Sequence, residues 1–188
     1  QAGGKTILLD CDMRKPSLHK ILGYPRDKGI SSILVGNCEV RDALITTQVP
    51  NLDIIPCGPI PPNPSEILGS PRMSKLMEFL RKTYSKIIID SPPITAVTDA
   101  VVLGSLVDGT VLVIRAGGTP REIVRNGLNQ LKGVNSPILG VVLNGVDMNR
   151  DGYYYYQYYY YYYGEDGERK KKVHSTKKRS RSEETLPS

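Results

Sequence analysis

The stretch TILLDCD, residues 6–12, decides the fold class. It begins as an unbroken aliphatic run and ends with two aspartates, Asp10 and Asp12, two positions apart. Unbroken aliphatic runs are typical of parallel strands covered on both faces, whereas strands with one solvated face alternate apolar and polar residues. We therefore predict a buried strand at residues 6–10 that carries acidic side chains at its carboxyl end.

Four more aliphatic runs have the same character and predict further covered strands: LDIIP (52–56), KIIID (86–90), TVLVI (110–114) and ILGVVL (138–143). Between the runs, residues 71–84 and 120–133 have apolar side chains at helical spacing, with proline near each start and Gly133 at the second end. Strands that alternate with helices in this way predict an α/β domain, built on a mainly parallel sheet flanked by helices.

The apolar periodicity stops near Asp147, which divides the chain into two predicted parts. We expect an ordered domain at residues 1–146 and a disordered tail at residues 147–188. Ten of the twelve tyrosines lie in the tail, in the cluster YYYYQYYYYYY of residues 153–163, and a basic extension follows at residues 168–181. A cluster of this kind is either a compositional accident or a functional segment, and the sequence of the preceding domain indicates which.

Composition excludes few functions. The 188 residues are 39% hydrophobic, with no run of apolar residues long enough to span a membrane and no secretory signal, so we expect a soluble, cytoplasmic fragment. Three cysteines without a C-x-x-C pattern favour a reduced setting. The net charge of +6 and the basic extension could serve nucleic acid or anionic lipid, but a solvated tail is the simpler interpretation, and no nucleic-acid partner is expected.

Acidic side chains follow two of the predicted strands, at Asp10, Asp12 and Asp90. Ligands of α/β proteins bind beyond the carboxyl ends of the parallel strands. Side chains two positions apart on a strand face the same way, so Asp10 and Asp12 would repel each other unless a cation lay between them. A hard divalent ion such as Mg²⁺ fits these oxygen ligands. The alternative is that the aspartates cap the following helices, which explains Asp90 alone better than it explains all three.

The tripeptide Gly4-Lys5-Thr6 matches the end of a glycine-rich phosphate-binding loop. Such a loop follows a strand and precedes a helix, whereas this tripeptide runs directly into the predicted strand at residues 6–10. We therefore reject it as a phosphate site.

Several segments together resemble the cytoplasmic domain of the bacterial tyrosine kinases (BY-kinases) that are associated with exopolysaccharide co-polymerases. They are LLDCDMRKP (8–16), PPNPSEIL (61–68), KIIIDSPP (86–93), GVVLNGVD (140–147) and the tyrosine cluster. The first resembles the Walker A′ motif of that family and the third its Walker B motif. The resemblance covers residues 1 to about 163 and implies a P-loop-NTPase-like fold, related to the partition and cell-division ATPases of the ParA and MinD type.

The sequence departs from the family pattern at its start. In that family a Walker A loop and its helix lie just upstream of the A′ strand, whereas this sequence begins with QAGGKT, which resembles the end of that helix. The resemblance therefore implies that residues 1–146 are a partial nucleotide-binding kinase domain, with the Walker A′ and Walker B motifs but without the Walker A loop. We expect such a fragment to be a poor kinase by itself. The parent would be a protein-tyrosine autokinase at the cytoplasmic face of the bacterial inner membrane, regulating exopolysaccharide and capsule synthesis.

The resemblance implies roles for the acidic residues. Asp12 and Asp90 would hold Mg²⁺ and, with Asp10, form the catalytic set, in which Asp10 orients or deprotonates the attacking phenol. A free tyrosine has a pKa near 10, so a nearby base is useful at neutral pH.

Three further residues are implied to bind the nucleotide, ATP. Arg14 and Lys15 would screen phosphate charge, although surface cations at a helix start are an equally good interpretation. Asn144 would contact the adenine edge, or is an ordinary loop asparagine. Thr98 and Asp99 are weaker candidates for the site, and Ser65, in NPSEIL, is expected to cap a helix.

The tyrosine cluster is implied to be the phosphoryl acceptor. Its members are Tyr153, Tyr154, Tyr155, Tyr156, Tyr158, Tyr159, Tyr160, Tyr161, Tyr162 and Tyr163. In the family the tail is phosphorylated in trans, within a homo-oligomeric ring, and the implied partners are a membrane-embedded co-polymerase or activator region and a cognate tyrosine phosphatase. Two alternatives stay open: a ParA- or MinD-like ATPase without kinase activity, and a non-catalytic acceptor.

Overall fold

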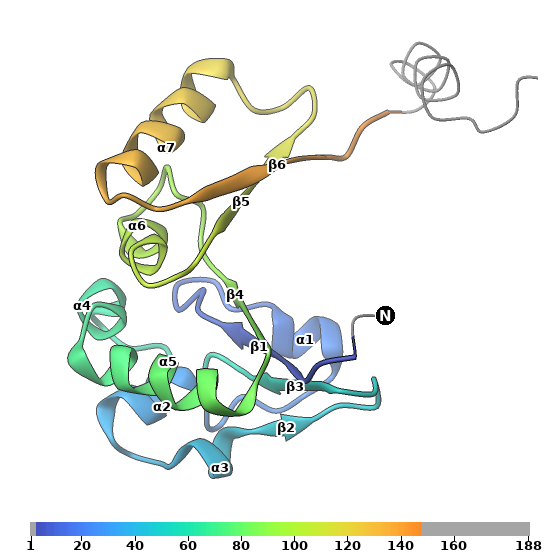
Figure 1. Ribbon diagram of the computed structural model, residues 1–188, viewed down its shortest axis with the longest axis vertical. Helices are drawn as coiled ribbons and strands as arrows, with labels where there is room; N and C mark the ends of the chain where they lie inside the picture. The colour runs from blue at the N-terminus through green and yellow to red at the C-terminus, as the bar shows by residue number, and fades with distance from the viewer. Residues whose placement is uncertain (1–2, 148–188) are drawn as a thin grey trace, which may run out of the picture. The chain divides into compact units, whose positions relative to one another are not determined.

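The computed structural model describes residues 3–147, and it forms one compact unit up to Asn144 (Figure 1). In chain order the elements are β1 (Thr6–Asp10), α1 (Leu18–Leu22), α2 (Ile30–Val35), α3 (Val40–Ala43), β2 (Ile45–Thr46), β3 (Leu52–Ile55), α4 (Pro64–Leu68), α5 (Pro71–Thr83), β4 (Lys86–Asp90), α6 (Asp99–Gly104), β5 (Thr110–Arg115), α7 (Arg121–Gly133) and β6 (Ile138–Asn144). The predicted boundary at residue 146 and the predicted tail, with its tyrosine cluster, fall at or beyond the end of the described residues.

All five predicted strands and both predicted helices are confirmed. Each strand boundary lies within one residue of the expected one, because the aliphatic runs end abruptly at polar residues or proline. The sequence gave no bounds for β2 or for the helices of four to six residues, α1, α2, α3, α4 and α6, although a helix was expected at NPSEIL. Elements this short contain at most two helical turns, so they cannot show a periodic pattern.

The strands are mainly parallel, as predicted, but they form two sheets. The first has the order β2-β3-β1-β4, in which β1 is parallel to β3 and to β4, and the short β2 is antiparallel to β3. The second contains β5 and β6, paired in parallel. Within the described residues β4 and β5 do not pair with each other, so each presents an unpaired backbone edge.

The core lies around the first sheet. Ile7 and Leu9 of β1 are fully buried. They belong to one cluster with the apolar side of α5, where Met73 and Leu80 are also fully buried. Since β1 is an interior strand of its sheet, with partners on both edges, its carboxyl end is held in place by two ladders of backbone hydrogen bonds.

The second sheet is far less covered. Val113 of β5 is 62% exposed and Leu139 of β6 is 72% exposed, although both strands are rich in aliphatic residues. The prediction that every aliphatic strand is covered on both faces is therefore wrong for β5 and β6 among the described residues. It is also wrong for β4 of the first sheet, where Ile88 is 53% exposed. A parallel strand is covered only where other elements pack against its faces. The helices that lie beside the second sheet are α6 and α7 (Figure 1), and they leave side chains such as Val113 and Leu139 exposed.

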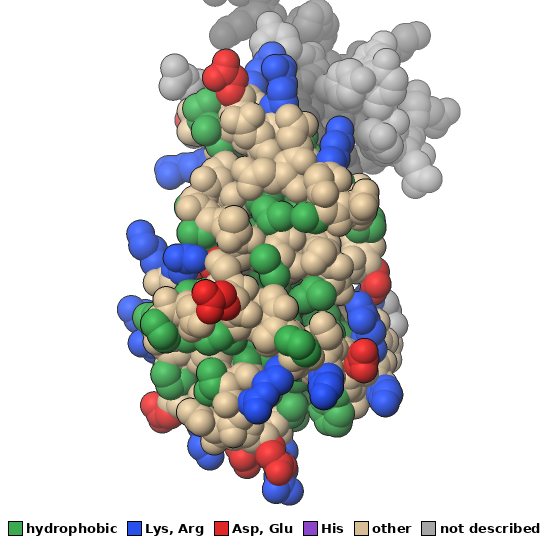
Figure 2. All heavy atoms as spheres, turned by 90° about the vertical axis from the view of Figure 1, so that its left-hand side faces the viewer, with side chains coloured by type: hydrophobic (Ala, Val, Ile, Leu, Met, Phe, Trp, Pro, Cys, Tyr) green, Lys and Arg blue, Asp and Glu red, His purple; other side chains and the backbone are tan. Residues whose placement is uncertain are grey.

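Charged side chains of both signs are distributed over the face seen in Figure 2, with hydrophobic side chains exposed between them. None of the helices within residues 3–147 has the length and the hydropathy that crossing a bilayer requires. The rejection of Gly4-Lys5-Thr6 as a phosphate loop is confirmed, since Thr6 begins β1 and the Lys5 ammonium lies 3.4 Å from the Asp53 carboxylate.

Candidate active site

Three carboxylates lie together at the carboxyl ends of β1 and β4. Asp10 and Asp90 are the last residues of these strands and lie opposite each other in the parallel ladder. The backbone N–H of Cys11 donates to the carbonyl oxygen of Asp90 at 2.9 Å, which extends the pairing by one residue. Asp12 follows in the next loop, close enough to Asp10 and Asp90 for its charge to act on both. The structure thus brings the three predicted acidic residues to one sheet edge.

Asp10 is fully buried, and neither of its carboxylate oxygens has a hydrogen-bond partner among the described residues. Burial, followed by the negative charge of Asp90, raises the pKa of Asp10 from 3.8 to about 6. The backbone N–H groups of Asp12 and Leu18 lie close enough to offset part of this shift without meeting hydrogen-bond geometry. A buried carboxylate without a partner is energetically costly, so this site favours a cation or a proton.

Asp90 is half-buried, and its ionised form is disfavoured for the same reasons as that of Asp10. Burial raises its pKa, the charge of Asp12 adds to that effect, and the backbone N–H of Ser91 offsets part of it. Like charges that oppose each other's ionisation are typical of functional carboxylate groups. A positive ion between them would reverse the effect.

The alternative that these aspartates cap the following helices is wrong. The helix after β1 is α1, and its N-cap residue is Ser17; the helix after β4 is α6, and its N-cap residue is Thr98. Asp12 instead closes a local turn. Its Oδ1 atom accepts hydrogen bonds from the backbone N–H groups of Arg14, at 3.1 Å, and Lys15, at 2.9 Å.

The donor set fits Mg²⁺ better than it fits a metal that is held entirely by protein. Within residues 3–147 no group of three or more His, Cys, Asp or Glu side chains is arranged to hold a metal ion. Mg²⁺ usually takes one or two protein carboxylates and completes its octahedron with phosphate oxygens and water. Asp12 and Asp90, beside the unpartnered buried oxygens of Asp10, fit that pattern.

The predicted nucleotide-binding residues lie on different elements. The Arg14 guanidinium donates from Nε and Nη2 to the two oxygens of Asp99, at 2.9 and 3.0 Å. The Lys15 side chain is exposed. Asn144 ends β6, opposite Arg115 in the ladder, and its carbonyl oxygen accepts from the Ala116 N–H at 2.8 Å. Their contacts with a nucleotide stay predictions.

Sequence reasoning missed the group that surrounds Arg14. Asp99 is fully buried, and the Ser65 hydroxyl donates to its Oδ1 atom, while Arg14 Nη2 also approaches Ser65 Oγ at 3.3 Å. The expectation that Ser65 caps a helix is wrong, because Ser65 lies inside α4 and the N-cap residue is Asn63. No local pattern links residues 14, 65 and 99, so the sequence carried no signal for this contact.

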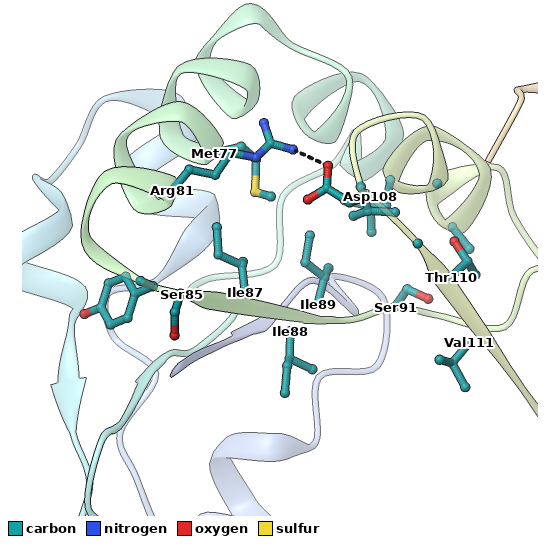
Figure 3. A pocket seen from close by; sticks show the side chains of 16 residues that line it. Met77, Arg81, Ser85, Ile87, Ile88, Ile89, Ser91, Asp108, Thr110 and Val111 are labelled. Atoms are coloured by element: carbon teal, nitrogen blue, oxygen red, sulfur yellow. Dashed lines mark ion pairs between the residues drawn. The ribbon is translucent and has the colours of Figure 1, made fainter. Parts of the chain in front are cut away.

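Two cavities lie between β4 and β5. One, of about 390 Å³, runs along β4 and is lined by Ile87, Ile88 and Ile89, with Thr110 and Val111 on the β5 side (Figure 3). Arg81 and Asp108 form an ion pair of 3.6 Å at its rim. The other cavity, of about 510 Å³, includes Asp90 and reaches the carboxyl end of β5. Its size is that of an ordinary small-molecule site, and Asp90 is the one of the three carboxylates that lines it.

The chain is similar to several bacterial kinases. It is 37% identical over 150 residues to the tyrosine-protein kinase YwqD of Bacillus subtilis, a match that covers 80% of this chain and 63% of YwqD. It is 38% identical over 150 residues to the tyrosine-protein kinase CpsD of Streptococcus agalactiae, covering 78% of this chain and 65% of CpsD. The chain thus spans slightly less than two thirds of the length of each relative. No family model matches it.

Solved structures agree with these relatives. The crystal structure of the VpsO kinase domain superimposes with a TM-score of 0.73 at 36% identity, covering 77% of this chain and 72% of that one. The cell-division ATPase MinD of Pyrococcus furiosus superimposes with a TM-score of 0.61 at 24% identity, covering 75% of this chain and 59% of MinD. The second likeness concerns the fold alone, and it confirms that the fold is similar to that of MinD, as predicted.

Proposed function

Since the chain belongs to the family of bacterial tyrosine-protein kinases, we propose that it forms the acidic side of a kinase site that transfers the γ-phosphoryl group of ATP to tyrosine. The observation that carries the proposal is the meeting of Asp10, Asp12 and Asp90 at the carboxyl ends of two adjacent parallel strands. Phosphoryl transfer requires positioning and charge compensation at such an edge. The kinase would regulate exopolysaccharide or capsule synthesis.

Asp12 and Asp90 would hold Mg²⁺, which when bound neutralises charge on the phosphate oxygens. Asp10 would accept the proton of the attacking phenol. Without a bound cation the pKa of Asp10 is about 6, so its carboxylate is mostly ionised at neutral pH, and a nearby Mg²⁺ would keep it ionised. Its unpartnered oxygens are available for that proton.

Arg14 and Lys15 would lie near the phosphates, and Asn144 near the adenine. Asn144 is exposed at the carboxyl end of β6, the same end of its sheet at which β5 borders the larger cavity.

The acceptors would be the tyrosines of residues 153–163, phosphorylated in trans within a ring of subunits. Ten phenols on one segment raise the local concentration of acceptor, and no single register has to be met. We further propose that a membrane-embedded co-polymerase activates the kinase at the cytoplasmic face of the membrane and that a cognate phosphatase opposes it.

The test joins the part of YwqD that precedes its matched segment to Gln1 of residues 1–188. The purified chimera is incubated with Mg²⁺ and ATP, and tandem mass spectrometry locates phosphotyrosine. We expect several modified tyrosines within residues 153–163 and none without Mg²⁺. Tyr24 and Tyr84, outside the cluster, serve as internal controls and should stay unmodified. A chimera that hydrolyses ATP but forms no phosphotyrosine would support a MinD-like ATPase instead.

A further inference from the structure

An ion pair between the exposed Arg14 and the buried Asp99 lies two residues along the chain from Asp12 of the acidic site. Asp99, the first residue of α6, has a fully buried carboxylate, and the Arg14 guanidinium binds both of its oxygens. Ser65 of α4 donates a third hydrogen bond to Asp99, and Thr98 Oγ1 donates to Ser65 Oγ at 3.2 Å. Residues from three separated segments therefore meet at one carboxylate.

The group contains one negative charge, on Asp99, and one positive charge, on Arg14. Burial by itself would raise the pKa of Asp99, but the hydrogen bonds from Arg14 and Ser65 outweigh it and hold the pKa below its usual value. The hydrogen bond to Asp99 likewise raises the pKa of Arg14. The ionised Arg14 guanidinium thus binds Asp99 through two parallel hydrogen bonds. This planar, two-point contact fixes the orientation of the Arg14 side chain more firmly than a lysine ammonium could.

Arg14 also connects this group to Asp12. Its backbone N–H donates to Asp12 Oδ1, and the adjacent N–H of Lys15 donates to the same atom. The guanidinium is fixed by α6 and α4, so the backbone at residues 14–15 is anchored from outside the loop. The direction of the Asp12 carboxylate depends on that anchored backbone.

We propose that Asp99 and Ser65 are positioning residues, which act through Arg14 to aim the Asp12 carboxylate at the Mg²⁺ of the bound nucleotide. This inference rests on the proposed kinase function. It assigns Arg14 a part in orienting Asp12 in place of direct screening of phosphate charge. It also gives the NPSEIL segment a task, since α4 supplies Ser65 to the group.

The chain contains a matched control. Asp53 of β3 is also a buried carboxylate with one cationic and one hydroxyl partner, namely Lys5 at 3.4 Å and Tyr84 at 2.7 Å. Its hydrogen bonds and its ion pair within residues 3–147 involve neither Asp12 nor Arg14 nor Lys15. Asp53→Asn therefore reproduces the loss of a paired buried carboxylate without disturbing the Asp12 turn.

The first experiment follows backbone amide exchange by NMR in residues 1–188. Asp99→Asn should speed exchange at the amides of Arg14 and Lys15 by roughly fivefold or more, the ratio expected when one hydrogen bond is weakened. Ser65→Ala should act in the same direction to a smaller extent, and it serves as the milder variant if Asp99→Asn folds poorly. Asp53→Asn should leave both amides unchanged. Unchanged amides in a folded Asp99→Asn or Ser65→Ala variant would overturn the proposal.

The second experiment uses the chimera with YwqD and measures the Mg²⁺ concentration that gives half-maximal phosphorylation. Asp99→Asn should raise it by about 10- to 100-fold, the usual cost of losing a residue that orients a metal ligand. Arg14→Lys should match that rise, and the double variant should be no worse than either single variant. Asp53→Asn should not alter it.

The outcomes distinguish a positioning role of Asp99 and Ser65 from direct contact between Arg14 and the phosphates. A rise in the KM for ATP in Arg14→Lys that Asp99→Asn does not share would indicate direct phosphate contact and overturn the positioning role. An equal rise of the Mg²⁺ requirement in Asp53→Asn would reduce the effect to lost stability and overturn it as well. A parent chimera without phosphotyrosine would contradict the proposed function, while the exchange experiment would still decide the positioning role.

Discussion

The two sheets have similar sequences and different surroundings. Strands β1 and β5 are both short aliphatic runs that end in a charged residue, Asp10 and Arg115. Leu9 of β1 is fully buried, whereas Val113 of β5 is 62% exposed. The residues that make a strand apolar therefore do not determine whether it is covered.

The difference has a functional side. The carboxylates that we assign to the kinase site end strands of the first sheet, where β1 is held on both edges. In the second sheet each strand has one partner among the described residues, and the facing edges of β4 and β5 border two cavities. A further parallel strand between these edges would satisfy both and cover Val111.

The largest expected effect is on the rate of tyrosine phosphorylation, and it compares substitutions at the carboxyl ends of the two sheets. In the chimera, Asp12→Asn or Asp90→Asn should lower the rate of tyrosine phosphorylation by at least about 100-fold, because charge stabilisation by a bound metal is worth several kcal/mol. Asn144→Ala should lower it by less than about tenfold, the value of a single hydrogen bond. Initial rates of phosphate incorporation measure both. Comparable rates in all three variants would show that the assignment of the acidic site is wrong.

The second effect compares one buried and one exposed aliphatic residue. Leu9→Ala should lower the free energy of unfolding of residues 1–188 by about 2–5 kcal/mol, since it leaves a cavity in the core. Val113→Ala, at an exposed position, should change it by less than about 0.5 kcal/mol. Urea unfolding followed by circular dichroism measures the difference. Equal losses would mean that the second sheet is covered in solution.

The third effect concerns the two buried carboxylates of the first sheet that have opposite environments. The pKa of Asp10 is raised from 3.8 to about 6, so ionising it costs the folded state stability as the pH rises from about 4 to 6, and the cost stays constant above that range. Asp10→Asn should therefore stabilise metal-free residues 1–188 at pH 8 by up to about 3 kcal/mol, because one pKa unit corresponds to about 1.4 kcal/mol. At pH 4 the gain should nearly vanish.

Asp53→Asn should do the reverse. Burial would raise the pKa of Asp53, but the contacts with Tyr84 and Lys5 lower it by more than burial raises it. The ionised form of Asp53 therefore stabilises the fold above the unfolded pKa, and this stabilisation is lost as the pH falls through the folded pKa. The variant should be destabilised at pH 8 and progressively less so below pH 3.8. Thermal unfolding across this pH range checks both signs, and a stabilising Asp53→Asn variant would contradict the comparison.

The smallest effect tests what covers the second sheet. Val111→Thr should change the stability of residues 1–188 by less than about 0.5 kcal/mol, because Val111 is 52% exposed. In the chimera the added segment should cover β5, and the same substitution should then cost about 1–3 kcal/mol by burying a hydroxyl. Thermal unfolding of the four proteins gives the difference. A substitution that costs equally little in both would mean that the added segment does not reach β5.

Much of this molecule followed from the sequence. The runs at residues 6–10 and 86–90 predicted their strands closely, and the aspartates at their ends predicted an acidic edge, because strand formation and side-chain alternation depend on residues close together in the chain. The motifs LLDCDMRKP and KIIIDSPP, in combination with the tyrosine cluster, indicated the family. The roles of Asp10, Asp12 and Asp90 in the reaction remain proposals.

Tertiary structure alone decided the rest. The ladder set Asp10 opposite Asp90, and folding brought Asp99 to Arg14 across 85 residues and to Ser65 across 34. It also left β5 and β6 exposed in the described residues, although their composition resembles that of β1. Contacts between distant segments depend on how whole elements pack, and burial depends on what lies against a face. Neither quantity is encoded in the short-range pattern by which a sequence specifies its strands and helices.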